Sequence, residues 1–201
     1  METFSLVIAI AVVVYLLKSR EQRRRIALLG SYLGRYQIER LMEHLTQGYL
    51  RALGEEDPER RAQIWQLLGE SEKTLNEQFR RFVAEFARVE AAEARVSKFA
   101  LALPYADRLF PFATFDLRQA LEIHARGIAQ AVENRLDQPL KARAYTLSAE
   151  LFLMQHTCHW FCRSKAVASA RMLARHQTSY AQLVDAVSPE TREAYRRLVG
   201  R

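Results

Sequence analysis

Residues that break helices are scarce in this chain of 201 residues. It contains seven glycines, five prolines and two cysteines, whereas 49% of its residues are hydrophobic. The low glycine and proline content leaves few turn signals for a β-sheet and favours long helices. Two cysteines are too few for the disulfide framework of a small exported domain. The apolar content is too high for a chain that is mostly disordered.

Basic charge outside one short region is also limited. The formal net charge is +7, and residues 18–40 carry seven basic and two acidic side chains. The much longer segment 41–201 therefore holds only a small basic excess. Nucleic-acid binding requires a basic face on the folded domain, so we expect no nucleic-acid partner.

Motifs for known chemistry are absent as well. The chain has no P-loop, no G-x-G-x-x-G, no H-E-x-x-H and no G-x-S-x-G. We therefore predict no small-molecule substrate and no catalytic residue, and an enzyme with an unrecognised site is a third alternative behind the two given below.

The most informative segment that is present is the apolar run at residues 1–17. No charged side chain occurs between Thr3 and Leu17. As a helix, 17 residues extend about 25 Å, slightly less than the hydrocarbon core of about 30 Å. The run is apolar on every face, which is typical of a membrane anchor rather than an amphipathic core helix. The expected anchor residues are Phe4, Leu6, Val7, Ile8, Ile10, Val12, Val13, Val14, Leu16 and Leu17.

A basic segment, residues 18–25, follows the apolar run. A cleaved secretion signal would have its positive charge before the apolar run and a small-residue cleavage site after it, and this chain has neither. The positive-inside rule then predicts a single-pass anchor of a bacterial inner membrane, with the N-terminus outside and a cytoplasmic C-terminal domain. The same charges can contact anionic lipid or serve topology alone. They are Lys18, Arg20, Arg23, Arg24 and Arg25.

The remaining residues, 26–201, have helical spacing throughout. Apolar side chains recur at steps of three and four, which predicts an all-α bundle of long, coiled-coil-like antiparallel helices. Helix-start signals occur at Asp57–Pro58 and at Ser188–Pro189, whereas Pro139 either kinks or restarts a helix. The expected helices are 26–53, 58–103, 115–136, 139–186 and 189–199.

An aromatic loop is expected after the second of these helices. A helix over 58–103 would be about 69 Å long and would return antiparallel to the membrane surface. The loop at that end contains Phe110, Phe112 and Phe115. These aromatic side chains either contact the bilayer or plug the end of the bundle core.

The densest group of reactive side chains is His156, Cys158, His159 and Cys162. Thiolates and imidazoles suit zinc or another soft metal, although one helix can supply only two or three of the ligands and a fourth would come from elsewhere, such as His124 or His176. The alternative is core packing, because Cys158 lies on the apolar seam.

These observations favour a membrane-anchored helical adaptor, scaffold or assembly subunit. It would contact membrane lipids and protein partners and would form homo-oligomers through uncovered apolar seams, without a cofactor. The alternative is a membrane-tethered metal or thiol-redox sensor that uses the cysteine–histidine group.

Overall fold

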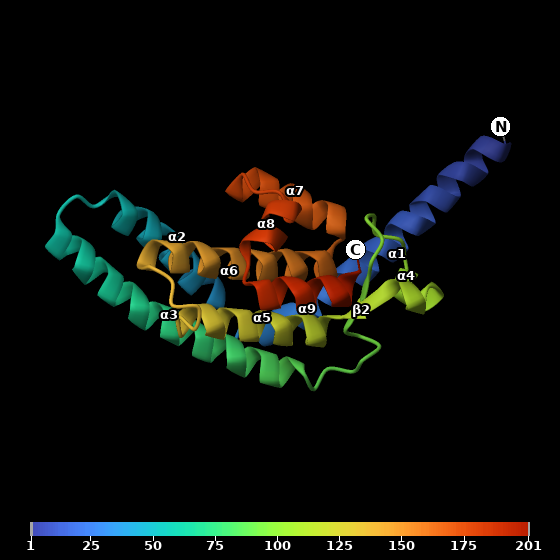
Figure 1. The fold of residues 1–201 in the computed structure, drawn as a ribbon. Coiled ribbons are helices and arrows are strands. Elements are labelled where there is room, and N and C mark those ends of the chain that lie inside the picture. The colour runs from blue at the N-terminus through green and yellow to red at the C-terminus, as the bar shows by residue number, and fades with distance from the viewer. Residues whose placement is uncertain (1, 201) are drawn as a thin grey trace.

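The computed structural model describes residues 2–200 and confirms the all-α class, in the form of an elongated helical bundle (Figure 1). A short two-stranded sheet, which the sequence did not predict, joins the helices. In chain order the elements are α1 Glu2–Leu33, α2 Ile38–Gly54, α3 Pro58–Phe86, β1 Arg95–Ser97, α4 Ala106–Leu109, the 3-10 helix η1 Pro111–Ala113, β2 Thr114–Asp116, α5 Leu117–Val132, α6 Leu140–Cys162, α7 Lys165–His176, α8 Tyr180–Ala186 and α9 Pro189–Val199.

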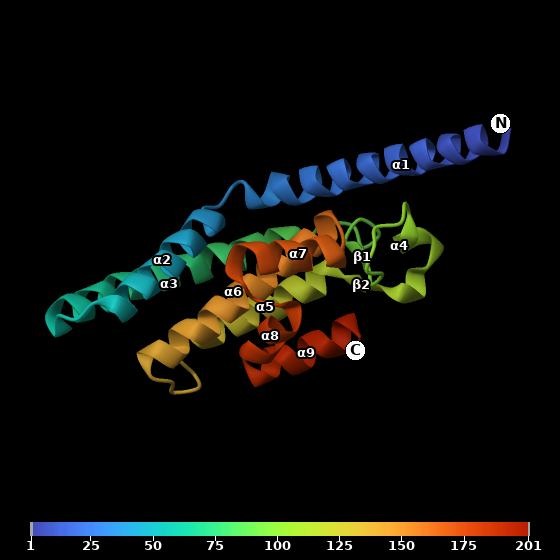
Figure 2. The ribbon, with the colours of Figure 1, turned by 90° about the horizontal axis from the view of Figure 1, so that it is seen from above.

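Helices α5 and α6 lie at the centre of the bundle. α3 and α9 pack against α5, α7 and α8 pack against α6, and α2 forms an antiparallel hairpin with α3 (Figure 2). Residues that are almost completely buried come from five of these helices: Leu45, Leu75, Phe79, Phe82, Leu121, Ile128, Leu147, Phe161 and Tyr195. The hairpin of α2 and α3 extends away from the end at which the N-terminus lies (Figure 2).

α1 is one continuous helix of 32 residues, so the predicted boundary between residues 25 and 26 does not exist. Its first half projects from the bundle (Figure 1), and its second half packs on α3, where the rings of Tyr32 and Phe86 are 5.4 Å apart. The predicted single helix 26–53 is also wrong, because a turn separates α1 from α2. A Cβ on Gly34 would lie 2.8 Å from the Gly30 carbonyl oxygen, so this close turn requires glycine.

The predicted helix 58–103 ends at Phe86, well before Leu103. Asp57 caps its start as expected, since its carboxylate accepts a hydrogen bond from the Glu59 backbone N–H at 2.9 Å. At the other end, the Arg118 guanidinium donates to the Val89 carbonyl oxygen at 3.0 Å. A distant side chain therefore holds the turn that follows α3, which local sequence does not reveal.

β1 and β2 pair antiparallel, with Val96 opposite Phe115. The next helix starts at Leu117 and not at residue 115, because Asp116 caps it and Thr114–Asp116 form β2. The sheet therefore takes residues that were assigned to the two flanking helices.

The predicted helix 139–186 is divided into α6, α7 and α8. Ser164 caps α7, and Ser179 forms a capping box with Gln182 at the start of α8. Pro139 restarts a helix rather than kinking one, since α6 begins at Leu140. The last helix, with Ser188 as its cap and residues 189–199, is confirmed.

Candidate membrane interface

The first half of α1 is exposed on every side. Its apolar window of 18 residues contains no buried residue, and it is long and apolar enough to cross a membrane, as no other helix among residues 2–200 is. A core helix of a soluble protein would be mostly buried, so that alternative is excluded; an anchor and a secretion signal share these properties. The exposed residues are Phe4, Leu6, Val7, Ile8, Ile10, Val12, Val13, Val14, Tyr15 and Leu16.

Contacts between α1 and the bundle begin at Leu17, where the predicted anchor ends. The Arg25 guanidinium lies 2.7 Å from a Glu21 carboxylate oxygen and 3.3 Å from a carboxylate oxygen of Asp107. The same guanidinium lies over the ring of Phe161, 5.4 Å from its centroid. Arg25 is therefore a partly buried linker between α1, α4 and α6, and we correct its assignment as a lipid-facing charge.

The other four basic residues of segment 18–25 are less involved in contacts with the bundle than Arg25 is. Arg24 pairs with Glu93 in the turn after α3, and its side chain remains 63% exposed. Lys18, Arg20 and Arg23 form none of the ion pairs found among residues 2–200, and Arg20 and Arg23 are exposed. Lys18 is partly buried and lines a cavity with residues of the bundle, so only Arg20 and Arg23 are fully open to solvent among these three cations.

The loop between β1 and β2 lies beside this part of α1. The Tyr105 backbone N–H donates to a Glu21 carboxylate oxygen at 2.9 Å, across 84 residues of sequence. The expected helix to the membrane end does not exist, yet an irregular segment brings the aromatic loop to the predicted place. Figure 1 shows α4 at the end of the bundle from which α1 projects.

The three aromatic residues of the loop have different environments. Phe110 is 38% exposed and Phe112 is 83% exposed, and their rings lie 6.1 Å apart. Phe115 is buried in β2, 5.0 Å from the ring of Trp160. Phe115 therefore plugs the end of the core, and we correct its assignment to the membrane-contacting loop.

The cysteine–histidine group does not form one site. His156 faces α7 and α8, with its Nε2 3.0 Å from the Ser169 hydroxyl oxygen and its ring 4.6 Å from that of Tyr180. The other three residues, Cys158, His159 and Cys162, line a cavity of about 180 Å³ between α6 and the α1–α2 turn. Among residues 2–200, no group of three His, Cys, Asp or Glu side chains is placed to hold a metal ion.

The suggested additional ligands are also occupied elsewhere. The His124 Nε2 lies 3.0 Å from the Thr157 hydroxyl oxygen in the core, and the His176 ring stacks on Phe152 at 4.0 Å. Burial lowers the pKa of His124 and of His156 to about 3, so both are neutral at pH 7.

The surroundings of Cys158 and Cys162 disfavour the reactive thiolate form. Burial raises the pKa of Cys162 to about 11 and raises the pKa of Cys158 further. The Cys158 Sγ instead contacts the Met154 sulfur at 3.9 Å. A redox or metal-binding thiol requires a lowered pKa, so this geometry supports the packing alternative.

No protein-family model, curated protein or solved structure matches the chain. The functional argument therefore rests on the geometry of this molecule.

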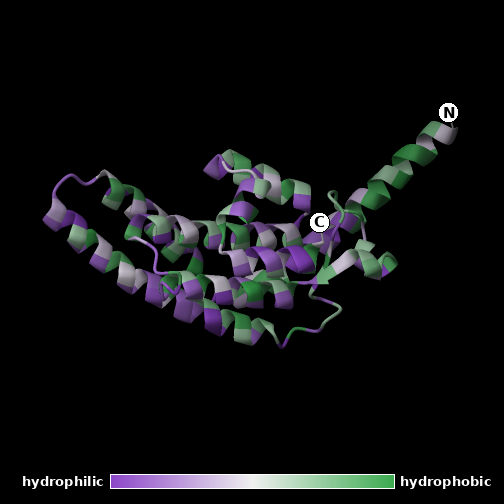
Figure 3. Cartoon of the chain, in the orientation of Figure 1, coloured by the Kyte–Doolittle hydropathy of each residue, from purple (hydrophilic) through white to green (hydrophobic). Residues whose placement is uncertain are grey.

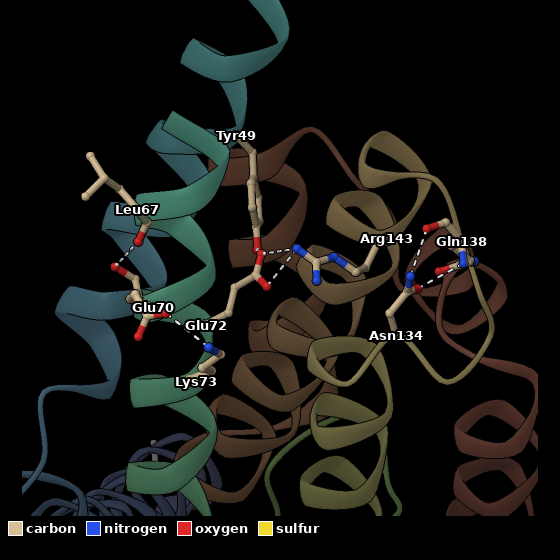
Figure 4. A network of polar contacts seen from close by, with 9 residues as sticks. Tyr49, Leu67, Glu70, Glu72, Lys73, Asn134, Gln138 and Arg143 are labelled. Atoms are coloured by element: carbon tan, nitrogen blue, oxygen red, sulfur yellow. Dashed lines mark hydrogen bonds and ion pairs between the residues drawn. The ribbon is translucent and has the colours of Figure 1, made fainter. Parts of the chain in front are cut away.

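A buried ionic network, which sequence reasoning missed, fixes the α2–α3 hairpin to α6 (Figure 4). The Tyr49 hydroxyl donates to a Glu72 carboxylate oxygen at 2.7 Å, and the Arg143 guanidinium lies 3.0 Å from the other oxygen. Burial is the main influence on Glu72 and raises the pKa of its carboxyl group. The available signal was that Glu72 lies in the apolar seam, between Leu68 and Leu75.

A second buried acid, Glu150, was also missed. One of its oxygens accepts a hydrogen bond from the Ser188 backbone N–H at 3.0 Å, at the start of α9. Burial raises the pKa of Glu150 to about 7. Gly127 provides the necessary space, since a Cβ there would collide with the Glu150 carboxylate and the Thr191 hydroxyl. Both acids connect helices that are distant in sequence, and both are inaccessible to a ligand.

Proposed function

We propose that this protein is a membrane-anchored helical scaffold that holds a protein partner at a set distance from a bilayer. One observation carries the proposal: α1 is exposed and apolar on all sides up to Leu16, and the same unbroken helix packs into the bundle from Leu17 onward. An anchor that is also a structural helix joins the bundle to the membrane without a flexible linker.

The opposite end of the molecule supports the scaffold interpretation. The α2–α3 hairpin extends beyond the other helices (Figure 2), and it exposes leucine side chains near its tip. Leu50 is 70% exposed and Leu67 is 69% exposed, although both lie on helices that pack together. Exposed apolar side chains of this kind suit an amphipathic partner helix. The basic residues after the anchor favour a cytoplasmic position for the bundle, at the bacterial inner membrane.

Anchoring is tested with Ile10→Arg in the full chain. A charge at the centre of the anchor costs about 2.5–3.5 kcal/mol of insertion free energy, so the fraction resistant to alkaline extraction should fall. Gln66→Arg, on the exposed face of α3, is the matched control. Reporters fused after Arg201 then establish the side of the membrane, and an exported C-terminus would refute the orientation.

Scaffolding is tested by photocrosslinking in cells. A photoreactive amino acid at Leu67 should give a discrete protein adduct that disappears in the Ile10→Arg background. Tyr145, which is 59% exposed on α6, is the control position. Equal labelling from both positions, or none from Leu67, would contradict a docking role for the hairpin.

A further inference from the structure

We propose that the segment from Phe99 to Phe112 is a second membrane contact, which lies in the interfacial layer of the bilayer beside the anchor. The inference rests on the proposed anchoring by α1 and adds a lipid-binding surface on the folded bundle. Its side chains on that surface are Phe99, Leu101, Leu103, Leu109, Phe110 and Phe112; we call these six residues the apolar loop patch.

The position of the patch along α1 is set by direct contacts. Lys18, Leu101 and Leu103 line the same small cavity, which Phe99 also borders. Lys18 is the first charged residue after the apolar run, so it lies at the level of the lipid headgroups once α1 is inserted. The patch therefore lies at headgroup level as well.

The patch is apolar, exposed and continuous. Leu101 is 69% exposed, Leu109 is 67% exposed and Phe112 is 83% exposed. The ring of Phe99, next to Lys18, is 5.4 Å from that of Phe110, which in turn contacts Phe112. Figure 3 shows apolar colour both on the projecting half of α1 and around α4, at the same end of the molecule.

The charges around the patch match an anionic lipid surface. Arg108 is exposed on α4, and Lys18 borders the patch from α1. Aromatic side chains mixed with cations are typical of segments that lie in the headgroup region.

The position of the patch identifies lipid rather than protein as the occupant. Leu101 and Leu103 line a cavity together with Lys18, the first charged residue after the apolar run, so the patch borders the end of the proposed anchor. An apolar surface at that level faces the lipid into which the adjoining helix is inserted.

A second contact has a mechanical consequence. One membrane helix leaves the attached bundle free to rotate about the helix axis and to tilt. A lipid contact on one side of α1 selects a single face toward the bilayer and so fixes the direction in which the α2–α3 hairpin points.

The test measures tryptophan depth in the full chain, reconstituted in bilayers of phosphatidylcholine and phosphatidylglycerol. Phe112→Trp and Leu109→Trp introduce reporters in the patch, and Leu67→Trp, whose position is 69% exposed at the opposite end, is the matched control. The native tryptophans Trp65 and Trp160 also emit, so the spectrum of the unsubstituted protein is subtracted from that of each variant. Lipids brominated on the acyl chains should reduce the emission of both patch reporters and leave the Leu67→Trp emission unchanged.

Two results would overturn the inference. Equal emission of all three reporters with and without brominated lipid would show that the loop does not reach the bilayer. Equal quenching of all three would show that the bundle lies flat on the membrane, without a specific loop contact. Alkaline extraction of each reconstituted variant shows separately whether α1 is inserted, so a failure of anchoring is distinguished from a failure of the loop contact.

Discussion

Arg143→Met should destabilise the bundle by about 3–4 kcal/mol at pH 7. The Arg143 side chain is 15% exposed and that of Glu72 is 2% exposed, so this ion pair is shielded from solvent. Removing one partner of a buried pair leaves an uncompensated charge, which typically costs about 3–5 kcal/mol. The Tyr49 hydroxyl remains as the only strong donor to Glu72 and does not replace a cation.

Protonation of Glu72 limits this loss and makes it depend on pH. A glutamate has a pKa of about 4.3 in the unfolded chain, so keeping it neutral in the fold costs about 3.7 kcal/mol at pH 7 but only about 1 kcal/mol at pH 5, at 1.36 kcal/mol per unit. Burial already raises the pKa of Glu72 in the folded protein, and loss of the Arg143 charge raises it further. The stability of the variant should therefore decrease as pH rises from 5 to 7.

The assay is urea unfolding of the full chain in a mild detergent, followed by tryptophan fluorescence. Trp65 reports on the hairpin because its ring is 5.8 Å from that of Tyr49. Arg196→Met, which breaks an exposed pair with Asp185, is the control and should cost less than about 1 kcal/mol. A loss below about 1 kcal/mol for Arg143→Met, or a loss that is the same at pH 5 and pH 7, would refute the reasoning.

Three further predictions concern the buried groups. Because the folded pKa of Glu150 is raised to about 7, unfolding free energy should decrease as pH rises from about 4.3, the pKa in the unfolded chain, to about 7 and then level off; Glu150→Gln should remove this slope in denaturant titrations. Gly127→Ala should lower the free energy of unfolding by about 1–3 kcal/mol, because the added methyl group overpacks the site. Gly69→Ala, which has open space around it, should leave the free energy of unfolding unchanged or raise it by up to about 1 kcal/mol. Thermal unfolding compares the two variants. Cys158 should resist maleimide at pH 7 in the folded protein and react after unfolding, which mass spectrometry detects; rapid labelling of the folded chain would contradict its burial.

The sequence predicted those helix ends that are encoded by local capping chemistry. Asp57 and Pro58 start α3, and Ser188 and Pro189 start α9, where the side chain and the fixed proline dihedral act within one turn. The all-α class followed from the spacing of apolar residues.

The helix ends that the sequence missed depend on distant groups or on capping residues that were overlooked. α3 ends at Phe86, and distant groups hold the segment that follows it: Arg118, 29 residues from Val89, donates to the Val89 carbonyl oxygen, and Val96 pairs with Phe115 across the β1–β2 loop. Ser164 and Ser179 were local signals that the apolar periodicity concealed.

The sequence indicated where the candidate membrane interface lies, but not which of its side chains are exposed. Composition alone placed the anchor end at Leu17, where the bundle contacts begin. The division of the aromatic loop into a buried Phe115 and an exposed Phe112 depends on strand pairing, which no local pattern specified. The four cysteine and histidine residues lie within seven positions of one helix, yet helical geometry directs His156 away from the other three.

The length of the molecule follows from treating α1 as both anchor and core helix. In the proposed insertion, the segment from Leu17 to Leu33 extends up to about 24 Å from the bilayer, and the 17 residues of α2 add up to about 25 Å in the same general direction (Figure 2). The buried Glu72–Arg143 pair holds the α2–α3 hairpin against α6, so the hairpin does not swing independently of the bundle. A partner bound at Leu50 and Leu67 would thus be held near a fixed height above the membrane, a property that a flexible tether of the same length would not provide.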